Sequence, residues 1–156
     1  METQAIEITE IETLLEETMS LNHSRLTYRL SVLLSAYEER YDIMPELELE
    51  LTSGRGKPDV AIFPKLTYNW EEDIIRYTQP PITAIEILSP TQAFDALITK
   101  IRKIYFPAGV QSAWLVVPSV KAMHLFLPGQ PVSIVTSGIF HDPVSEVSLP
   151  IDSIFR

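Results

Sequence analysis

Residues 82–88 read Ile82-Thr83-Ala84-Ile85-Glu86-Ile87-Leu88, a nearly continuous apolar run that favours β structure. Such a run is typical of a central strand buried on both faces of a sheet. A clean helical stripe of apolar residues follows from Phe94 to Tyr105, and Pro107-Ala108-Gly109 ends it. Residues 113–117 predict another strand, so residues 86–117 are interpreted as a strand–helix–strand unit.

The rest of the chain predicts more strands and a second helix around this unit. A helix is expected from about Asn22 to Arg40, with Asn22 or Ser24 capping its first turn. Further strands are expected at residues 46–51, 59–63, 122–127, 132–135 and 144–149, with a turn at 52–57 and a loop at 66–81. The pattern predicts one α/β (α+β) domain over residues 1–156, with a mixed central sheet flanked by helices. Residues 1–20 are interpreted as an acidic N-terminal helix or extension.

Composition narrows the classes of protein that fit. Hydrophobic residues make up 46% of the 156 residues, which is enough for a core. No apolar run is long enough to cross a membrane, and the first 24 residues contain no Lys or Arg, unlike a secretory signal. Cysteine is absent, which excludes disulfides and thiolate metal sites. A cytoplasmic location is therefore expected, and no membrane partner.

The formal net charge of −9 is unfavourable for a nucleic-acid binder, because affinity for DNA comes largely from neutralising phosphates. The negative charge is uneven, however. Six glutamates lie within the first 17 residues, and three more alternate with leucine at residues 46–50. The charge therefore weakens a role in DNA binding without excluding it.

Glu86 and Asp59 are the residues whose positions indicate a chemical function. Glu86 lies inside an apolar run, where an unpaired carboxylate would cost several kcal/mol. Asp59 opens an apolar strand directly after Pro58. Two carboxylates on neighbouring strands can bind a hard cation such as Mg²⁺ or Mn²⁺, which activates water against a phosphodiester. The competing interpretations are an ion pair between Glu86 and an arginine such as Arg102, and a turn or cap role for Asp59.

A phosphodiester-cleaving site also needs a cation near the developing charge. Lys100 and Lys103 both lie on the helix that follows the Glu86 strand. On a helical wheel Lys100 borders the apolar stripe, whereas Lys103 points further out. Lys100 is therefore the favoured catalytic cation and Lys103 the alternative, although solvated lysines would explain both.

These residues form an ordered series that resembles a known family. The series is Lys57-Pro58-Asp59-Val60-Ala61-Ile62-Phe63, Ile85-Glu86-Ile87-Leu88-Ser89-Pro90-Thr91, Asp95, Lys100, Tyr105, Ala108-Gly109-Val110 and Trp114-Leu115-Val116. Together with Asn22-His23-Ser24 at a helix start, it resembles the Uma family of endonucleases, which belongs to the restriction-endonuclease-like PD-(D/E)XK superfamily. The resemblance covers roughly residues 20–127.

The resemblance implies a site at one end of a central strand pair, with Asp59 and Glu86 at the motif carboxylates. The superfamily pattern places a lysine two residues after the glutamate, where this chain has Leu88. The family is similar in taking its lysine from the following helix, which Lys100 would match. The spacing from Lys100 to Tyr105 is one residue longer than expected, so Lys103 stays a competitor. The Tyr-Glu-Leu and Gly-Glu hairpin that usually precedes the His-Ser helix is missing.

Other residues are weaker candidates. His23 at a helix start could act as a base or contact phosphate, or simply form local hydrogen bonds. Glu50, or its neighbour Glu48, could add a third carboxylate to the site, although a solvated strand face explains both. Tyr68 and Trp70 could stack on bases or cover the core.

Two functions follow from these observations. The first is a metal-dependent DNA endonuclease in which Asp59 and Glu86 bind Mg²⁺ or Mn²⁺ and Lys100 polarises the water or the phosphate. The second is a catalytically inactive protein of the same fold that acts as a binding or accessory subunit. A nuclease that cuts both strands would suit a symmetric homodimer.

Overall fold

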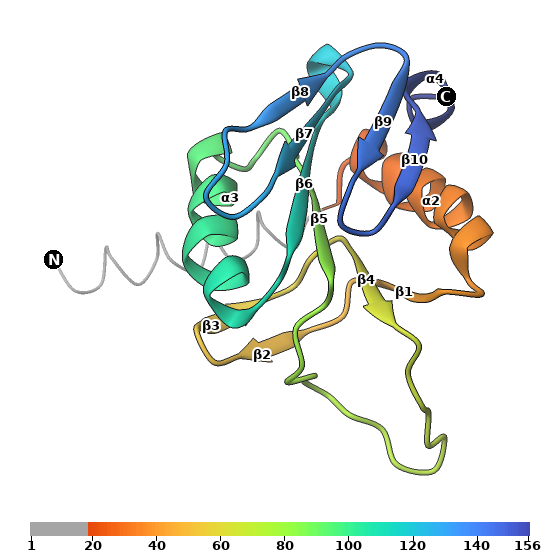
Figure 1. Ribbon diagram of the computed structural model, residues 1–156, viewed down its shortest axis with the longest axis vertical. Helices are drawn as coiled ribbons and strands as arrows, with labels where there is room; N and C mark the ends of the chain where they lie inside the picture. The colour runs from red at the N-terminus through yellow and green to blue at the C-terminus, as the bar shows by residue number, and fades with distance from the viewer. Residues whose placement is uncertain (1–18) are drawn as a thin grey trace, which may run out of the picture.

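The computed structural model describes residues 19–156, which centre on a six-stranded sheet in the order β1-β4-β5-β6-β7-β8 (Figure 1). These strands are Tyr41–Pro45, Val60–Pro64, Thr83–Ile87, Ser112–Val117, Ala122–Phe126 and Ser133–Val135. β5 and β6 are parallel, and the other neighbouring pairs are antiparallel. The prediction of a mixed sheet flanked by helices is confirmed.

Different elements cover the two faces of the sheet. One face packs against helix α2 (Leu21–Leu34), the hairpin β9–β10 (Ile139–Asp142 and Val147–Pro150) and the short helix α4 (Ile151–Ile154). The other face packs against helix α3 (Phe94–Lys100), its π-helical continuation (Ile101–Tyr105) and the hairpin β2–β3 (Leu49–Leu51 and Gly54–Gly56). Three short 3-10 turns are also present, at Ser35–Tyr37, Phe106–Ala108 and Pro118–Val120. In Figure 1, α3 and α2 lie on opposite sides of the strands.

The alternation of side chains along β5 sets the position of Glu86. Ile85 and Ile87 are fully buried in the core beneath α2, and Ala84 is fully buried in the core beneath α3. Successive side chains in a strand point to opposite faces, so Glu86 shares the α3 face with Ala84. The all-buried pattern of β5 agrees with the central strand that residues 82–88 predicted.

The second predicted helix differs from the structure at both ends. Neither Asn22 nor Ser24 is the cap: Ser20 is, because its side chain accepts a hydrogen bond from the backbone amide of His23 at 3.2 Å. The α-helix ends at Leu34 and continues as the 3-10 turn rather than reaching Arg40. The acidic helix expected in the N-terminal segment falls on residues 1–18, outside the described residues.

Several strand predictions also needed correction. Strand β1 at Tyr41–Pro45 was not predicted, and β3 at Gly54–Gly56 lies within the predicted turn at 52–57. The strand expected at residues 46–51 covers only Leu49–Leu51, because Glu46 has a left-handed backbone with φ of 53°. Strand β9 was not predicted, because its last two residues and the following Pro143 form a His-Asp-Pro sequence that favours a turn. The loop at 66–81 joins β4 to β5 and extends below the sheet in Figure 1. Among residues 19–156, no helix has the length and hydrophobicity needed to span a bilayer.

A buried carboxylate ties the β9–β10 hairpin to the sheet. Asp142 is fully buried, and its Oδ2 accepts hydrogen bonds from Ser112 Oγ at 2.6 Å and Trp114 Nε1 at 2.9 Å. Its Oδ1 accepts a hydrogen bond from the amide of Val144 at 2.8 Å. The buried side chains of Ser112 and Trp114 on β6 both donate to this carboxylate of the hairpin, so Asp142 has a structural role.

Replacing Asp142 by alanine should lower the free energy of unfolding by roughly 3–5 kcal/mol, because buried donors lose their acceptor. Urea denaturation followed by tryptophan fluorescence measures this change. Asp152→Ala, at an exposed carboxylate on α4, is the matched control and should change stability by about 0.5 kcal/mol or less. Equal stability of the two variants would contradict a structural role for Asp142.

Candidate active site

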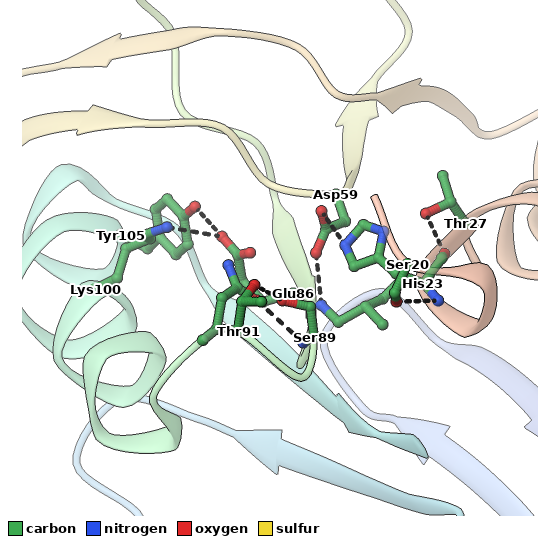
Figure 2. A network of polar contacts seen from close by, with 11 residues as sticks. Ser20, His23, Thr27, Asp59, Glu86, Ser89, Thr91, Lys100 and Tyr105 are labelled. Carbon is green, nitrogen blue, oxygen red and sulfur yellow. Dashed lines mark hydrogen bonds and ion pairs between the residues drawn. The ribbon is translucent and has the colours of Figure 1, made fainter. Parts of the chain in front are cut away.

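The pairing of β4 with β5 brings the two predicted carboxylates together. Val60 pairs with Ile85 in this antiparallel ladder, so Asp59 and Glu86 are the next residues at the same end of the sheet. Asp59 Oδ2 accepts a hydrogen bond from the backbone amide of Ile87 at 2.6 Å, which holds the aspartate against β5 (Figure 2). The position of Asp59 is therefore fixed by the backbone of the strand that carries Glu86.

Glu86 is a buried carboxylate with two cationic or donating neighbours. Only 2% of its surface is exposed. The Tyr105 hydroxyl donates a hydrogen bond to Glu86 Oε1 at 2.5 Å, and Lys100 Nζ lies 3.8 Å from the same oxygen. Burial raises the pKa of Glu86 to about 7, Lys100 and Tyr105 oppose this rise, and the nearby Asp59 adds to it. The site therefore strongly disfavours a second negative charge in the absence of a bound cation.

A π-helical turn places Lys100 and Tyr105 on the same side of their helix. The two residues are five positions apart, which would separate them by about 140° around a regular α-helix. The backbone is π-helical at Ile101–Tyr105, and the Phe106 amide donates to the carbonyl of Ile101, five residues earlier. This i to i+5 spacing aligns residues five apart. The extra residue noticed in the sequence is thus absorbed, and both side chains still reach Glu86.

Gly56 on β3 makes room for the tyrosine ring. A Cβ atom at this position would lie 2.7 Å from Tyr105 Cε1 and 3.1 Å from its hydroxyl oxygen. Tyr105 itself is fully buried, so its ring has no space into which to move. The absence of a side chain at Gly56 is therefore a condition for the contact between Tyr105 and Glu86.

His23 contacts Asp59 from the opposite side of the sheet layer. His23 Nε2 lies 2.8 Å from Asp59 Oδ1, and the histidine is 5% exposed. The hydrogen bond to Asp59 raises the pKa of His23, against the lowering effect of burial. Its Nδ1 atom is buried and has no hydrogen-bond partner among residues 19–156. His23, proposed from sequence as an alternative catalytic residue, is thus part of the constellation.

Other sequence candidates lie away from this cluster. Lys103 is exposed and forms no ion pair with Glu86. Glu50 is paired instead with Arg55 across the β2–β3 hairpin, at 3.6 Å, and is about half exposed. The guanidinium of Arg102, once a possible partner of Glu86, lies 5.5 Å from the ring centre of Phe126.

The aromatic residues of the β4–β5 loop form their own cluster. The rings of Tyr68 and Trp70 stack with centroids 5.8 Å apart, and Trp70 is 92% exposed. The Tyr68 hydroxyl donates to Asp42, which also pairs with Lys65. This arrangement anchors the loop to β1 rather than to the carboxylate pair.

The donor set fits a small hard cation. Within residues 19–156, no three or more His, Asp or Glu side chains are grouped so as to hold a metal ion. Mg²⁺ is usually held by one or two carboxylates, with water and substrate phosphate completing its shell. Two adjacent carboxylates, one of them buried with a pKa raised to about 7, meet this requirement through oxygen atoms alone.

Two contributors to the site were not assigned a role from the sequence. The sequence alone places Tyr105 in the apolar stripe of the helix and Gly56 in a turn. A tyrosine at the end of an otherwise aliphatic stripe was the available signal, since a buried hydroxyl needs a partner. The requirement for Gly56 depends on a contact between β3 and the π turn, and no local pattern encodes it.

The mixed sheet, with a carboxylate pair at one end of its central strands, has the architecture of the restriction-endonuclease-like class. The chain belongs to the Uma2 family, whose description is "Putative restriction endonuclease" and whose model matches residues 3–151. A crystal structure described as a putative nuclease belonging to DUF820 from Anabaena variabilis has the same fold. It is 24% identical, has a TM-score of 0.75, and the match covers 87% of this chain and 81% of that one. None of the curated proteins matches this chain.

The raised pKa of Glu86 predicts how stability depends on pH without metal. Between the ordinary value of 4.5 and about 7, the folded state holds a proton that the unfolded state has lost. The free energy of unfolding should therefore fall as pH rises through this window, by at most about 3 kcal/mol. Glu86→Gln should remove most of this fall and be more stable than wild type at pH 8. Urea titrations in EDTA at several pH values measure the free energy of unfolding of both proteins.

His23 should also lower the free energy of unfolding as pH rises, but at higher pH than Glu86. Its pKa is raised in the folded state, so the stability that its protonated form contributes is lost as pH rises through that folded-state pKa. The Glu86→Gln variant should therefore keep a decline that begins only above the ordinary histidine value. Glu39→Gln, at an exposed carboxylate, should follow wild type throughout. A Glu86→Gln curve that overlays wild type would contradict the buried, proton-holding glutamate.

A double-mutant cycle tests the contact between Tyr105 and Glu86. Tyr105→Phe removes only the hydroxyl, and its effect on the free energy of unfolding should differ between the wild-type and Glu86→Gln backgrounds by about 1.5–3 kcal/mol, as for a hydrogen bond to a charged group. Chemical denaturation at pH 8 measures all four proteins. Tyr41→Phe is the matched control, because the Tyr41 hydroxyl is also buried but donates to the Ser145 carbonyl at 2.8 Å. Coupling of Tyr41→Phe to Glu86→Gln as large as that of Tyr105→Phe would contradict a specific contact.

Proposed function

We propose that this chain is a divalent-metal-dependent DNA endonuclease. The observation that carries the proposal is the pairing of Asp59 with a fully buried Glu86 whose pKa is raised to about 7, with Lys100 Nζ 3.8 Å from the glutamate. Groups shifted in this way by burial and by a like charge are typical of functional sites. Membership of the Uma2 family supports the nuclease class.

In this proposal Asp59 and Glu86 hold Mg²⁺ or Mn²⁺. The bound ion supplies Lewis acidity toward a phosphoryl oxygen and lowers the pKa of a coordinated water. The protein contributes by fixing both carboxylates: the Ile87 amide and His23 orient Asp59, and Tyr105 orients Glu86. Partners of this kind commonly determine how well a ligand set binds its metal.

Lys100 is proposed as the catalytic cation. Its side chain is 31% exposed, so it spans the distance between the buried Glu86 and the substrate side of the site. At 3.8 Å its ion pair with Glu86 is at the long limit of such contacts, which leaves the ammonium able to turn toward a phosphate oxygen. An ammonium held close to the reacting group stabilises the charge that develops in the transition state.

DNA is the proposed substrate, and a symmetric dimer would allow both strands to be cut. A cytoplasmic location, which the absence of cysteine supports, would give the protein access to DNA. The alternative is a non-catalytic protein of the same fold, and the net charge of −9 is the observation that favours it. A cleavage assay separates the two.

The decisive experiment is nicking of supercoiled plasmid in Mg²⁺ or Mn²⁺. Asp59→Asn, Glu86→Gln and Lys100→Met should each lower the rate by at least about a hundredfold, because each removes a ligand or a charge needed in the transition state. Glu50→Gln and Lys103→Met, at an exposed carboxylate and an exposed lysine outside the cluster, should cut like wild type.

Calorimetry with Mn²⁺ accompanies this assay, and Asp59→Asn and Glu86→Gln should abolish measurable binding. Cutting at equal rates by wild type and the site variants would point to a contaminant and sink the proposal. A wild-type protein that neither cuts plasmid nor binds Mn²⁺ would establish the non-catalytic alternative.

A further inference from the structure

A groove leads away from the carboxylate pair along the surface. It consists of two adjoining cavities of about 490 and 210 Å³, which share Asn22 and Pro118 in their walls. The larger cavity is lined by residues 20–22 and 88–90. Residues 88–90 begin two positions after Glu86 on the chain, and residues 20–22 directly precede His23, so this cavity opens at the edge of the site. Figure 2 shows Ser20 beside His23, and Ser89 beside Thr91.

The groove carries charge of the opposite sign to the rest of the protein. No acidic side chain lines either cavity, although the whole chain has a net charge of −9. The smaller cavity is lined by three basic residues, Arg25, Lys121 and Arg156. Like charges gathered in one groove repel each other unless an anion binds between them, so this segregation fits an anionic occupant.

Two of these cations have distinctive local geometry. Lys121 follows the 3-10 turn at Pro118–Val120 and has a left-handed conformation, with φ of 48°. A bulky side chain in this conformation is uncommon, and such residues cluster at functional sites. Arg25 Nε donates a hydrogen bond to the Arg156 carbonyl at 3.1 Å, which restrains the guanidinium against the C-terminal residues.

The first turn of α2 adds polar groups to the same groove. Leu21 and Asn22 are its first two residues, and both line the larger cavity. The amides at the start of a helix have no carbonyl partner within the helix, and the helix dipole favours an anion there. The cations at one end and the helix start at the other therefore line a continuous path, rather than a closed pocket for a single ion.

We infer that this groove binds the phosphate backbone of the DNA strand that flanks the cleaved phosphodiester. The inference rests on the proposed nuclease function and adds the path of the substrate to it. Phosphates occur in series along a strand, and both cavities of the groove have polar residues in their walls. Each phosphate contact adds about 0.9 to the magnitude of the slope of log K against log salt, so the groove has a measurable signature.

The test is binding of a short fluorescein-labelled DNA duplex, followed by anisotropy in EDTA over a range of KCl concentrations. EDTA prevents metal-dependent cutting, so binding is measured apart from catalysis. Lys121→Asn removes the charge, and asparagine tolerates the left-handed backbone. Arg25→Gln removes the second cation. Each variant should weaken binding roughly eightfold at about 0.1 M salt and reduce the slope by about 0.9, and the double variant should reduce it by about 1.8.

Three controls accompany these variants. Lys103→Gln removes an exposed lysine outside the groove, and Lys121→Arg keeps the charge, so both should bind DNA like wild type. Melting temperatures identify any variant that fails to fold, and Lys121→Gly is then a replacement compatible with the same backbone. Inorganic phosphate, added at constant ionic strength, separates a strand path from a site for a free anion, because it should not displace the duplex.

The outcomes separate the groove from the proposed chemistry. Weaker binding with a smaller slope in Lys121→Asn and Arg25→Gln supports the strand path, even if wild type cuts no plasmid, in which case only the nuclease proposal fails. Unchanged affinity and slope in both variants overturn the path, even if wild type cuts plasmid. Displacement of the duplex by inorganic phosphate, or an equal effect of Lys103→Gln, would also overturn it.

Discussion

The burial of one carboxylate, that of Glu86, determines how the α3 side of the molecule is built. An ionised glutamate in the apolar interior is unfavourable by several kcal/mol unless it is paired or protonated. Here the tyrosine hydroxyl and the lysine ammonium of a single helix meet the same carboxylate oxygen. Their convergence requires the π turn between them, and the tyrosine ring requires Gly56 opposite it. One unfavourable residue thus accounts for a helix irregularity and a close contact on β3.

The two faces of the sheet have different roles because of this placement. The face beneath α2 contains most of the large aliphatic core and the Asp142 network, in which each donor has an acceptor. The face beneath α3 contains Glu86, with Lys100 and Tyr105 as its partners. Asp59 lies between the faces, since it accepts from the β5 backbone on one side and contacts His23 of α2 on the other. The geometry of the carboxylate pair therefore depends on both layers.

The sequence predicted the parts of this arrangement that have a local period. The buried strand around Glu86 and the stripe of the following helix both repeat over enough residues to define a face. The same helical wheel favoured Lys100 over Lys103, and the structure brings Lys100 to Glu86 and leaves Lys103 exposed. Lys100 precedes the π turn, so a regular helical wheel predicts its direction correctly. The same wheel would place Tyr105 about 140° away from Lys100 around the helix.

Features that depend on contacts between distant segments could not be predicted from local sequence patterns. The left-handed backbone at Glu46 shortens a strand whose Leu-Glu alternation was otherwise ideal. Ser20 rather than Asn22 caps α2, although both residue types are good caps, and only the position of the chain that enters the helix distinguishes them. At these positions the local sequence is compatible with several conformations, and tertiary packing determines which of them forms.

A net charge of −9 and binding to DNA are compatible if the charges are segregated. Affinity for a polyanion depends on the cations within about a Debye length of its phosphates, roughly 10 Å at 0.1 M salt, and only weakly on charges elsewhere. In this protein the described acidic residues outside the site include Glu50, paired with Arg55, and Asp42, paired with Lys65. The smaller cavity beside the site is lined by basic residues, and neither cavity is lined by an acidic side chain. Overall charge then limits non-specific attraction along the whole surface, while the groove retains the local potential that a single strand would encounter.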